Sequence, residues 1–135
     1  MKKTAIIVGI LLCFALVPAI AQKTGKITVK SQFKGIVEGY DHTCKTQLFI
    51  DGRLVGSSEE GLESKPSSFT VEVPRGKHDI KIMNYAFYEG NWEEHTKENN
   101  YSIDASYEGS VNLKKKLTIS LVFDIDKEET QAKVK

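Results

Sequence analysis

The chain has 135 residues, of which 40% are hydrophobic and 27% are charged, and its formal net charge at pH 7 is +1. This length suits one globular domain, and a near-zero charge provides no electrostatic basis for binding nucleic acid. Beyond the first residues, no apolar run approaches the roughly 20 residues that a membrane-spanning helix needs.

The N-terminus has the three parts of a secretory signal peptide. Lys2 and Lys3 form a positive start, residues 5–17 form an apolar run, and residues 19–21 (Ala-Ile-Ala) supply an A-x-A cleavage site. The apolar run is too short for a stable membrane anchor. We therefore expect residues 1–21 to be removed, which gives a mature protein that is periplasmic or secreted and has no membrane span. Removal takes two lysines and no acidic residue, so the net charge of +1 becomes −1.

The mature chain would keep a single cysteine, Cys44, because Cys13 lies within the signal. A lone cysteine cannot form an internal disulfide, so the sequence does not predict a disulfide-stapled scaffold. Two interpretations remain open for Cys44. It is either a small buried apolar residue or a thiol that links two copies of the chain.

Alternating apolar and polar residues, typical of half-buried strands, occur from the start of the mature chain. The pattern predicts three strands here, at residues 27–33, 46–50 and 53–55. Asp51-Gly52 joins the last two, and this pair suits a tight hairpin because both residues tolerate positive φ. Residues 57–68 are polar and contain Gly61 and Pro66, so we expect an exposed loop.

The second half of the chain continues the same alternation. It predicts strands at residues 69–73, 78–87, 100–107 and 117–125, with turns at residues 74–77, 89–91 and 114–116. A short helix over residues 92–98 is an alternative for the polar stretch before residue 100. Residues 127–135 are charged and lack a periodic apolar face, so we expect a flexible tail.

These strands predict an all-β fold, a small antiparallel β-sandwich formed by one domain over residues 22–126. The alternation also assigns the residues that should face the core. They are Ile27, Val29, Phe33, Leu48, Ile50, Phe69, Val71, Val73, Ile80, Ile82, Leu117, Ile119, Leu121, Phe123 and Ile125. Fully burying one such side chain stabilises a fold by about 1.5–3 kcal/mol, so this set is large enough for independent folding.

Two stretches carry a resemblance to a known family. Residues 48–56 read Leu-Phe-Ile-Asp-Gly-Arg-Leu-Val-Gly, and residues 69–82 contain Val-Pro-Arg-Gly-Lys-His between two strands. This pattern, over about residues 45–82, resembles PEGA-like domains, small immunoglobulin-like β-sandwich modules of bacterial envelope and secreted proteins. The resemblance implies an accessory or interaction role in the cell envelope, and it brings no catalytic residues.

The stretch from residue 85 to residue 101 is the strongest candidate for a binding site, because it mixes aromatic rings with hydrogen-bonding side chains. Aromatic faces cover the apolar surface of a sugar or a peptide, and neighbouring polar groups fix its orientation. The alternative is that the aromatic residues only pack within the fold. The candidate ligand-binding residues are Tyr85, Tyr88, Trp92, Glu94, His95, Asn99 and Tyr101.

Metal and catalytic signatures are weak. His95 with Glu93 and Glu94 could supply metal ligands, as could Asp41 with His42, but no His-x3-His or Cys-x2-Cys spacing occurs. No serine lies in a Gly-x-Ser-x-Gly elbow. We therefore expect no catalytic residues, no metal and no cofactor.

The sequence thus predicts an exported, non-catalytic binding domain of the bacterial cell envelope. Its ligand would be a carbohydrate or a peptide, on a protein or glycan partner that the sequence does not identify. The alternative is a structural subunit, a homodimer that associates through a strand edge or through Cys44.

Overall fold

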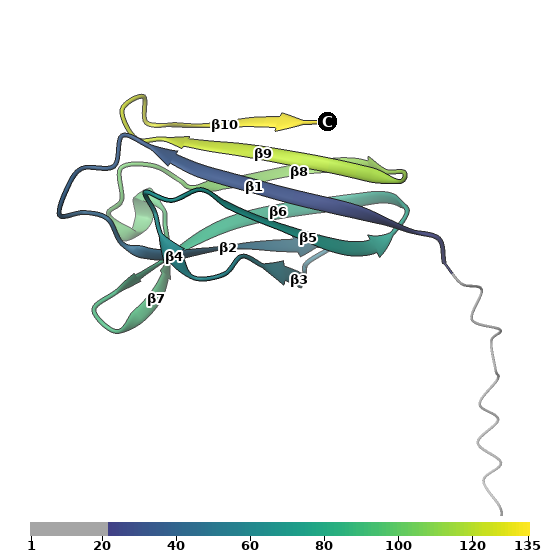
Figure 1. Cartoon of the computed structure of the whole chain (residues 1–135), viewed down its shortest axis with the longest axis horizontal. Coiled ribbons are helices and arrows are strands. Elements are labelled where there is room, and N and C mark those ends of the chain that lie inside the picture. Colours follow the sequence, from purple (N-terminus) through teal and green to yellow (C-terminus); the bar gives the residue numbers. More distant parts are fainter. Residues whose placement is uncertain (1–21) are drawn as a thin grey trace, which may run out of the picture.

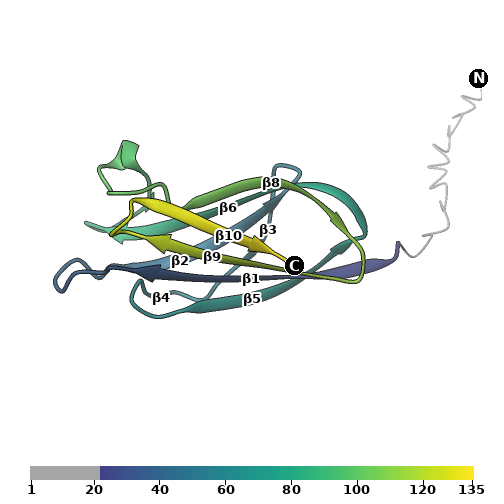
Figure 2. The ribbon, with the colours of Figure 1, turned by 90° about the horizontal axis from the view of Figure 1, so that it is seen from above.

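The computed structural model describes residues 22–135, which form two β-sheets that pack face to face (Figures 1 and 2). The expected signal peptide and its cleavage site before Gln22 involve residues 1–21 and lie outside the described residues. The all-β sandwich expected from the sequence is confirmed. Within residues 22–135, no helix is long and apolar enough to cross a membrane.

The first sheet has four strands in the order β10-β9-β1-β5. Neighbours run antiparallel except β1 and β9, which pair in parallel from Lys26 opposite Lys116 to Lys34 opposite Asp124. The sandwich is therefore mixed rather than purely antiparallel. The strands are β1 (Thr24–Lys34), β5 (Ser67–Pro74), β9 (Lys116–Asp124) and β10 (Glu129–Val134).

The second sheet is built around the longest strand, β6. One side of β6 pairs with β2, while its other side pairs first with β8 and then with β7. Two short strands, β3 and β4, pair with opposite ends of β2. The bounds are β2 (Thr43–Ile50), β3 (Arg53–Ser57), β4 (Gly61–Leu62), β6 (Gly76–Tyr88), β7 (Asn91–Glu94) and β8 (Ser106–Leu113).

The core lies between the sheets and matches the predicted alternation. Of the residues expected to face inward, those buried most completely are Ile27, Val29, Leu48, Ile50, Val73, Ile80, Ile82, Ile119, Leu121 and Phe123. The other five expected residues, Phe33, Phe69, Val71, Leu117 and Ile125, pack against them at the margin. The apolar face of each strand thus supplies the burial that holds the sandwich together.

The two predicted reversals have the backbone geometry that their residues favour. Asp51 and Gly52 both adopt positive φ, 49° and 82°, and close the β2–β3 hairpin. Pro74 is the last residue of β5. Gly76, with φ 125°, is the first residue of β6. Because β5 and β6 belong to different sheets, this second turn carries the chain across the sandwich.

The prediction of a strand over residues 100–107 is wrong for its first part. Tyr101, Ile103, Ala105 and Tyr107 alternate, but the strand β8 begins only at Ser106. Ile103 and Ala105 are buried from an irregular segment, so their spacing reflects packing against the core and not strand pleating. The alternative helix over residues 92–98 is replaced by β7 and by a single 3-10 turn, η1 (Lys97–Asn99).

Two segments expected to be irregular pair with strands. Residues 129–134 form β10, which pairs with β9, in place of the expected flexible tail. Within the expected loop over residues 57–68, Gly61 and Leu62 form β4 against the start of β2. Glu63, the next residue, is almost completely buried, so this loop is only partly exposed.

Candidate functional site

One end of the sandwich gathers the connections β1–β2, β4–β5, β6–β7, β7–β8 and β9–β10 (Figure 1). A pocket of about 550 Å³ opens at this end, and we call it the loop-end pocket. Its apolar and aromatic lining comes from Ile36, Val37, Tyr40, Tyr88, Tyr101 and Ile125. Its polar lining includes His42, Glu63, Glu93, His95, Asn99 and Asn100.

The connection between β7 and β8 places two of these residues. Backbone hydrogen bonds of Asn84 in β6 fix the base of the connection. The Asn84 backbone amide donates to the carbonyl of Ala105, and the Asn84 backbone carbonyl accepts from the amide of His95, both at 2.9 Å. The amide of Ala105 donates to the carbonyl of His95 at 2.8 Å. His95 is therefore held between the sheets, and the connection loops out beyond it and carries Tyr101.

The loop that contains Tyr101 is fixed by its own polar groups. The backbone amide of Lys97 donates to Asp104 Oδ1 at 2.8 Å, and Asn99 Nδ2 donates to the carbonyl of Glu94 at 2.8 Å. The amide of Tyr101 donates to the carbonyl of Thr96 at 3.1 Å. These bonds give the pocket wall a defined shape before any ligand binds.

Glu63 comes from the opposite side of the pocket, after β4. Its amide donates to the carbonyl of His42 at 3.0 Å, and Asp41 accepts hydrogen bonds from both the amide and the hydroxyl of Ser64. These bonds tie the chain after β4 to the start of β2. They turn the Glu63 side chain into the interior, where only 1% of it is exposed.

The Glu63 carboxylate faces two imidazoles. His42 Nδ1 lies 3.1 Å from Glu63 Oε1 and makes a hydrogen bond with it. Because a carboxylate oxygen only accepts, His42 Nδ1 is the donor. His95 Nδ1 lies 3.7 Å from the same oxygen, has no hydrogen-bond partner within residues 22–135, and belongs to a side chain that is only 3% exposed.

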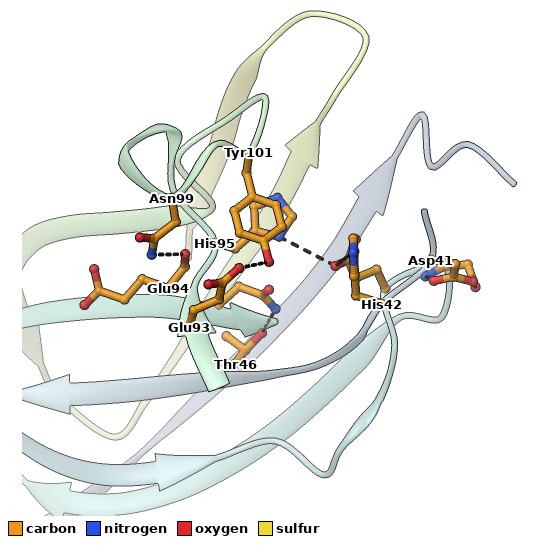
Figure 3. A network of polar contacts seen from close by, with 11 residues as sticks. Asp41, His42, Thr46, Glu93, Glu94, His95, Asn99 and Tyr101 are labelled. Atoms are coloured by element: carbon orange, nitrogen blue, oxygen red, sulfur yellow. Dashed lines mark hydrogen bonds and ion pairs between the residues drawn. The ribbon is translucent and has the colours of Figure 1, made fainter. Parts of the chain in front are cut away.

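Aromatic rings contact both histidines of this cluster, and Figure 3 shows Tyr101 beside His95. The rings of His95 and Tyr101 stack with centroids 4.2 Å apart, and the Tyr101 hydroxyl donates to Glu93 Oε1 at 2.6 Å. His42 meets the rings of Tyr88 and Tyr101 edge-on, at 5.9 Å in both cases. Burial and the hydrogen bond to Glu93 raise the pKa of Tyr101 far above its ordinary value, so its hydroxyl stays neutral and donates.

Behind the pocket a chain of buried polar side chains links the two sheets. Thr46 Oγ1 accepts from Asn84 Nδ2 at 3.1 Å and shares a hydrogen bond of 3.1 Å with the hydroxyl of Ser31. Ser31 in turn shares a bond of 2.8 Å with Ser67. Asn84 Oδ1 has no partner within the described residues. This polar chain marks where the apolar core ends and the polar site begins.

The seven ligand-binding residues predicted from the sequence fall into two separate groups in the structure. Tyr88, His95, Asn99 and Tyr101 line the loop-end pocket, whereas Tyr85, Trp92 and Glu94 do not. The register of the β6–β7 hairpin explains this division, because Tyr85 pairs with Glu94 and Phe87 pairs with Trp92. Directly opposed residues share a face of the sheet, and successive residues alternate between faces.

Trp92 therefore belongs to a separate cluster on the outer face of the hairpin. Its ring centroid lies 5.1 Å from that of Phe87, and the Lys45 ammonium sits 4.2 Å from the indole centroid. Trp92 is half-buried by these neighbours. The two aromatic groups that sequence reasoning placed together thus lie on opposite faces of one hairpin.

The pocket also contains residues that sequence reasoning did not assign to a binding site. Glu63 sits in a polar stretch that resembles any exposed loop, and its burial depends on the pairing of β4 with β2. Tyr40 and Val37 are 70% and 61% exposed, respectively, at the rim of the pocket. His42 and Glu93 carried only a weak metal signal in the sequence.

Neither a metal-ligand set nor an imidazole-activated nucleophile occurs among residues 22–135. Among residues 22–135, no three His, Cys, Asp or Glu side chains are arranged to hold a metal ion. In the same part of the chain, no hydrogen bond joins a serine, threonine or cysteine side chain to an imidazole, as an activated nucleophile would require. Burial raises the pKa of the Cys44 thiol to about 11, which makes it a poor nucleophile at neutral pH.

Comparisons with known proteins assign no family to the chain. No family model matches it, and no curated protein matches it. Similar solved structures include a Gram-negative toxin, with 12% identity and a TM-score of 0.39, and pneumolysin, with 14% identity and a TM-score of 0.39. Each of these two matches covers 84% of this chain, and the chain spans about a quarter of the length of those proteins. TM-scores of this size support no transfer of fold or function.

Proposed function

We propose that this protein is an exported, non-catalytic binding domain of the bacterial cell envelope, whose ligand enters the loop-end pocket. The observation that carries the proposal is the pocket itself, which combines aromatic walls with polar side chains held in place by hydrogen bonds. Binding sites for small ligands are typically concave and mostly apolar, with a few fixed polar groups. The N-terminal signal-peptide pattern and the PEGA-like pattern over residues 45–82 support the placement in the envelope.

The site we propose differs from the one expected from the sequence. It keeps Tyr88, His95, Asn99 and Tyr101 and adds residues from the β1–β2 and β4–β5 connections. The outer-face cluster around Trp92 is excluded from the pocket by the strand register. The ligand remains a peptide segment or a short glycan on an envelope partner, since aromatic rings beside hydrogen-bonding groups suit both.

Chemical-shift mapping tests this proposal. The ¹⁵N-labelled protein would be titrated with blocked tripeptides and, in a second series, with chitotriose and maltotriose. We expect at least one probe to shift amide resonances of residues 35–42 and 95–105, which surround the pocket. No shift with any probe, or shifts confined to the outer face near Trp92, would overturn the proposal.

A matched pair of variants makes the test specific. Tyr88 and Trp92 are aromatic residues of the same hairpin, but only Tyr88 lines the pocket. Tyr88→Ala should weaken binding of the probe, whereas Trp92→Ala should leave it unchanged. Thermal unfolding of both variants would verify that each remains folded. The reverse pattern would place the site on the outer face.

A further inference from the structure

We propose that the loop-end pocket recognises an organic cation, the guanidinium or ammonium group of an arginine or lysine side chain on a peptide. This inference rests on the proposed function and narrows it to one chemical class of ligand. Three independent features carry it, namely the charge of the lining, the unpartnered His95 nitrogen at the floor and the aromatic walls.

Among the described residues, the negative charge of the lining meets only the imidazoles of His42 and His95. Two carboxylates, Glu63 and Glu93, face the pocket, and in the described part of the chain no lysine or arginine lines it. A buried carboxylate without a cationic partner carries a large desolvation cost. A ligand cation would offset that cost, and the low local dielectric would strengthen the attraction.

The floor of the pocket holds one buried polar atom that lacks a hydrogen-bond partner among the described residues, His95 Nδ1. Glu63 Oε1 and His95 Nδ1 lie 3.7 Å apart, and His95 Nδ1 is buried without a partner. When the His95 proton resides on Nε2, Nδ1 is an acceptor, as the carboxylate oxygen always is. Two acceptors then face each other, of which Glu63 Oε1 already accepts from His42, and a ligand N–H group reaching the floor would supply the donor that His95 Nδ1 lacks. A guanidinium carries five such donors and an ammonium carries three.

The walls provide the faces that cations prefer. Tyr88 is 48% exposed and Tyr40 is more exposed still, so both rings are accessible at the mouth of the pocket. A cation over an aromatic face is attracted by the ring's electrons, and the attraction grows as the cation is desolvated. Tyr101 donates to only one oxygen of Glu93, Oε1, which leaves Oε2 to accept from the ligand. The outer-face cluster differs, because Lys45 already covers the Trp92 ring.

A set of four blocked tripeptides, acetyl-Gly-X-Gly-amide, distinguishes the effect of the charge of side chain X on binding from the effect of its shape. X would be arginine, lysine, glutamine or glutamate, and binding would be followed by the shifts of pocket amides and by calorimetry. We expect the arginine and lysine peptides to bind at least about tenfold more tightly than the glutamine peptide, which corresponds to the strength of one charge-assisted hydrogen bond. The glutamate peptide should not bind.

Two adjacent glutamates provide the matched control. Glu93 lines the pocket, while Glu94 pairs with Tyr85 on the outer face. Glu93→Gln should reduce the preference for arginine over glutamine about tenfold, and Glu94→Gln should leave it unchanged. Glu63→Gln should reduce the preference as well. Glu93 is only half-buried, so Glu93→Gln keeps the test valid if the Glu63 variant fails to fold.

The outcomes distinguish this inference from the proposed function. If the glutamine peptide shifts the pocket amides as strongly as the arginine peptide, the cation inference is wrong and the pocket remains a binding site. If only chitotriose or maltotriose shifts the pocket amides, the cation inference is wrong and the ligand is a glycan. If no probe shifts these amides, both proposals are wrong.

Discussion

Glu63 Oε1 and His95 Nδ1 lie 3.7 Å apart, although one residue follows β4 and the other follows β7. Both side chains are almost completely buried, and His42 donates to the same carboxylate oxygen. Buried charged and polar groups are costly unless they are paired. This cluster is therefore a place where the fold accepts a cost in stability and where we expect a role in binding.

The first prediction concerns the contribution of Glu63 to stability. Glu63→Gln keeps an oxygen that accepts from His42, whereas Glu63→Leu removes it and leaves the half-buried His42 and the buried His95 facing an apolar group. We expect the leucine variant to be less stable than the glutamine variant by about 1–3 kcal/mol, the cost of leaving a buried polar group unsatisfied. Urea unfolding of the two variants measures this difference. Equal stabilities would show that the hydrogen bond to His42 adds nothing to the fold.

The second prediction concerns the polar chain between the sheets. Thr46→Val preserves the side-chain shape but removes the oxygen that accepts from Asn84 Nδ2 at 3.1 Å. The side-chain amide nitrogen of Asn84 would then lose its hydrogen-bond partner, and we expect a loss of about 1–3 kcal/mol in the free energy of unfolding. Thr70→Val is the control, because Thr70 bonds with Thr28 at an exposed position. That variant should stay within about 0.5 kcal/mol of the wild type.

The third prediction follows from a histidine whose two ring nitrogens both face acceptors. His78 Nδ1 lies 2.7 Å from Asp51 Oδ2, and Nε2 lies 2.6 Å from the carbonyl of Pro74. The hydrogen bond to Asp51 raises the pKa of His78 above its ordinary 6.5, and the same bond lowers the pKa of Asp51 below 3.8.

The signs of these shifts fix the pH range in which the pair stabilises the fold. The contribution of His78 is complete below about 6.5 and is lost as the pH rises through its raised pKa in the folded protein. The contribution of Asp51 is complete above about 3.8 and is lost as the pH falls through its lowered pKa. His78→Gln should therefore destabilise the protein more at pH 5.5 than at pH 9. An equal loss at both pH values in urea unfolding would contradict this assignment.

The fourth prediction concerns Cys44. With a pKa raised to about 11 from an ordinary 9.0, the thiol has about 100-fold less thiolate at pH 8 than an unperturbed cysteine. Iodoacetamide should therefore label the folded protein about 100-fold more slowly than the urea-unfolded protein, since the thiolate is the nucleophile. Equally fast labelling of both forms would contradict the raised pKa. A disulfide-linked dimer on a non-reducing gel would instead favour the alternative of a self-associating subunit.

The strands were predictable where one face of each strand is buried. Ile27 and Val29, or Ile80 and Ile82, alternate with polar neighbours because the core requires it. Residues 129–134 gave no such signal, since β10 buries none of its side chains and is held by backbone pairing with β9. A strand held at a sheet edge by backbone hydrogen bonds needs no alternation of apolar and polar residues in its sequence. The apparent strand at residues 100–105 failed for the opposite reason, because apolar side chains can be buried from an irregular segment.

The candidate site could be predicted only for those of its residues that lie close together in the sequence. Tyr88, His95 and Tyr101 follow one another along a hairpin and its connection, so their proximity could be inferred from the sequence. Glu63 reaches the same pocket through the pairing of β4 with β2, a contact between distant parts of the chain. The division between the two faces depended on the register of β6 with β7, which a one-residue shift would reverse.

A crystal structure of the protein with acetyl-Gly-Arg-Gly-amide tests the central claim most directly, because it locates the ligand and its polar contacts together. The account predicts the peptide at the loop-end pocket, with the guanidinium in hydrogen-bond contact with Glu93 and beside the ring of Tyr88. A peptide bound on the outer face near Trp92 and Lys45, or no bound peptide at saturating concentration, would contradict it.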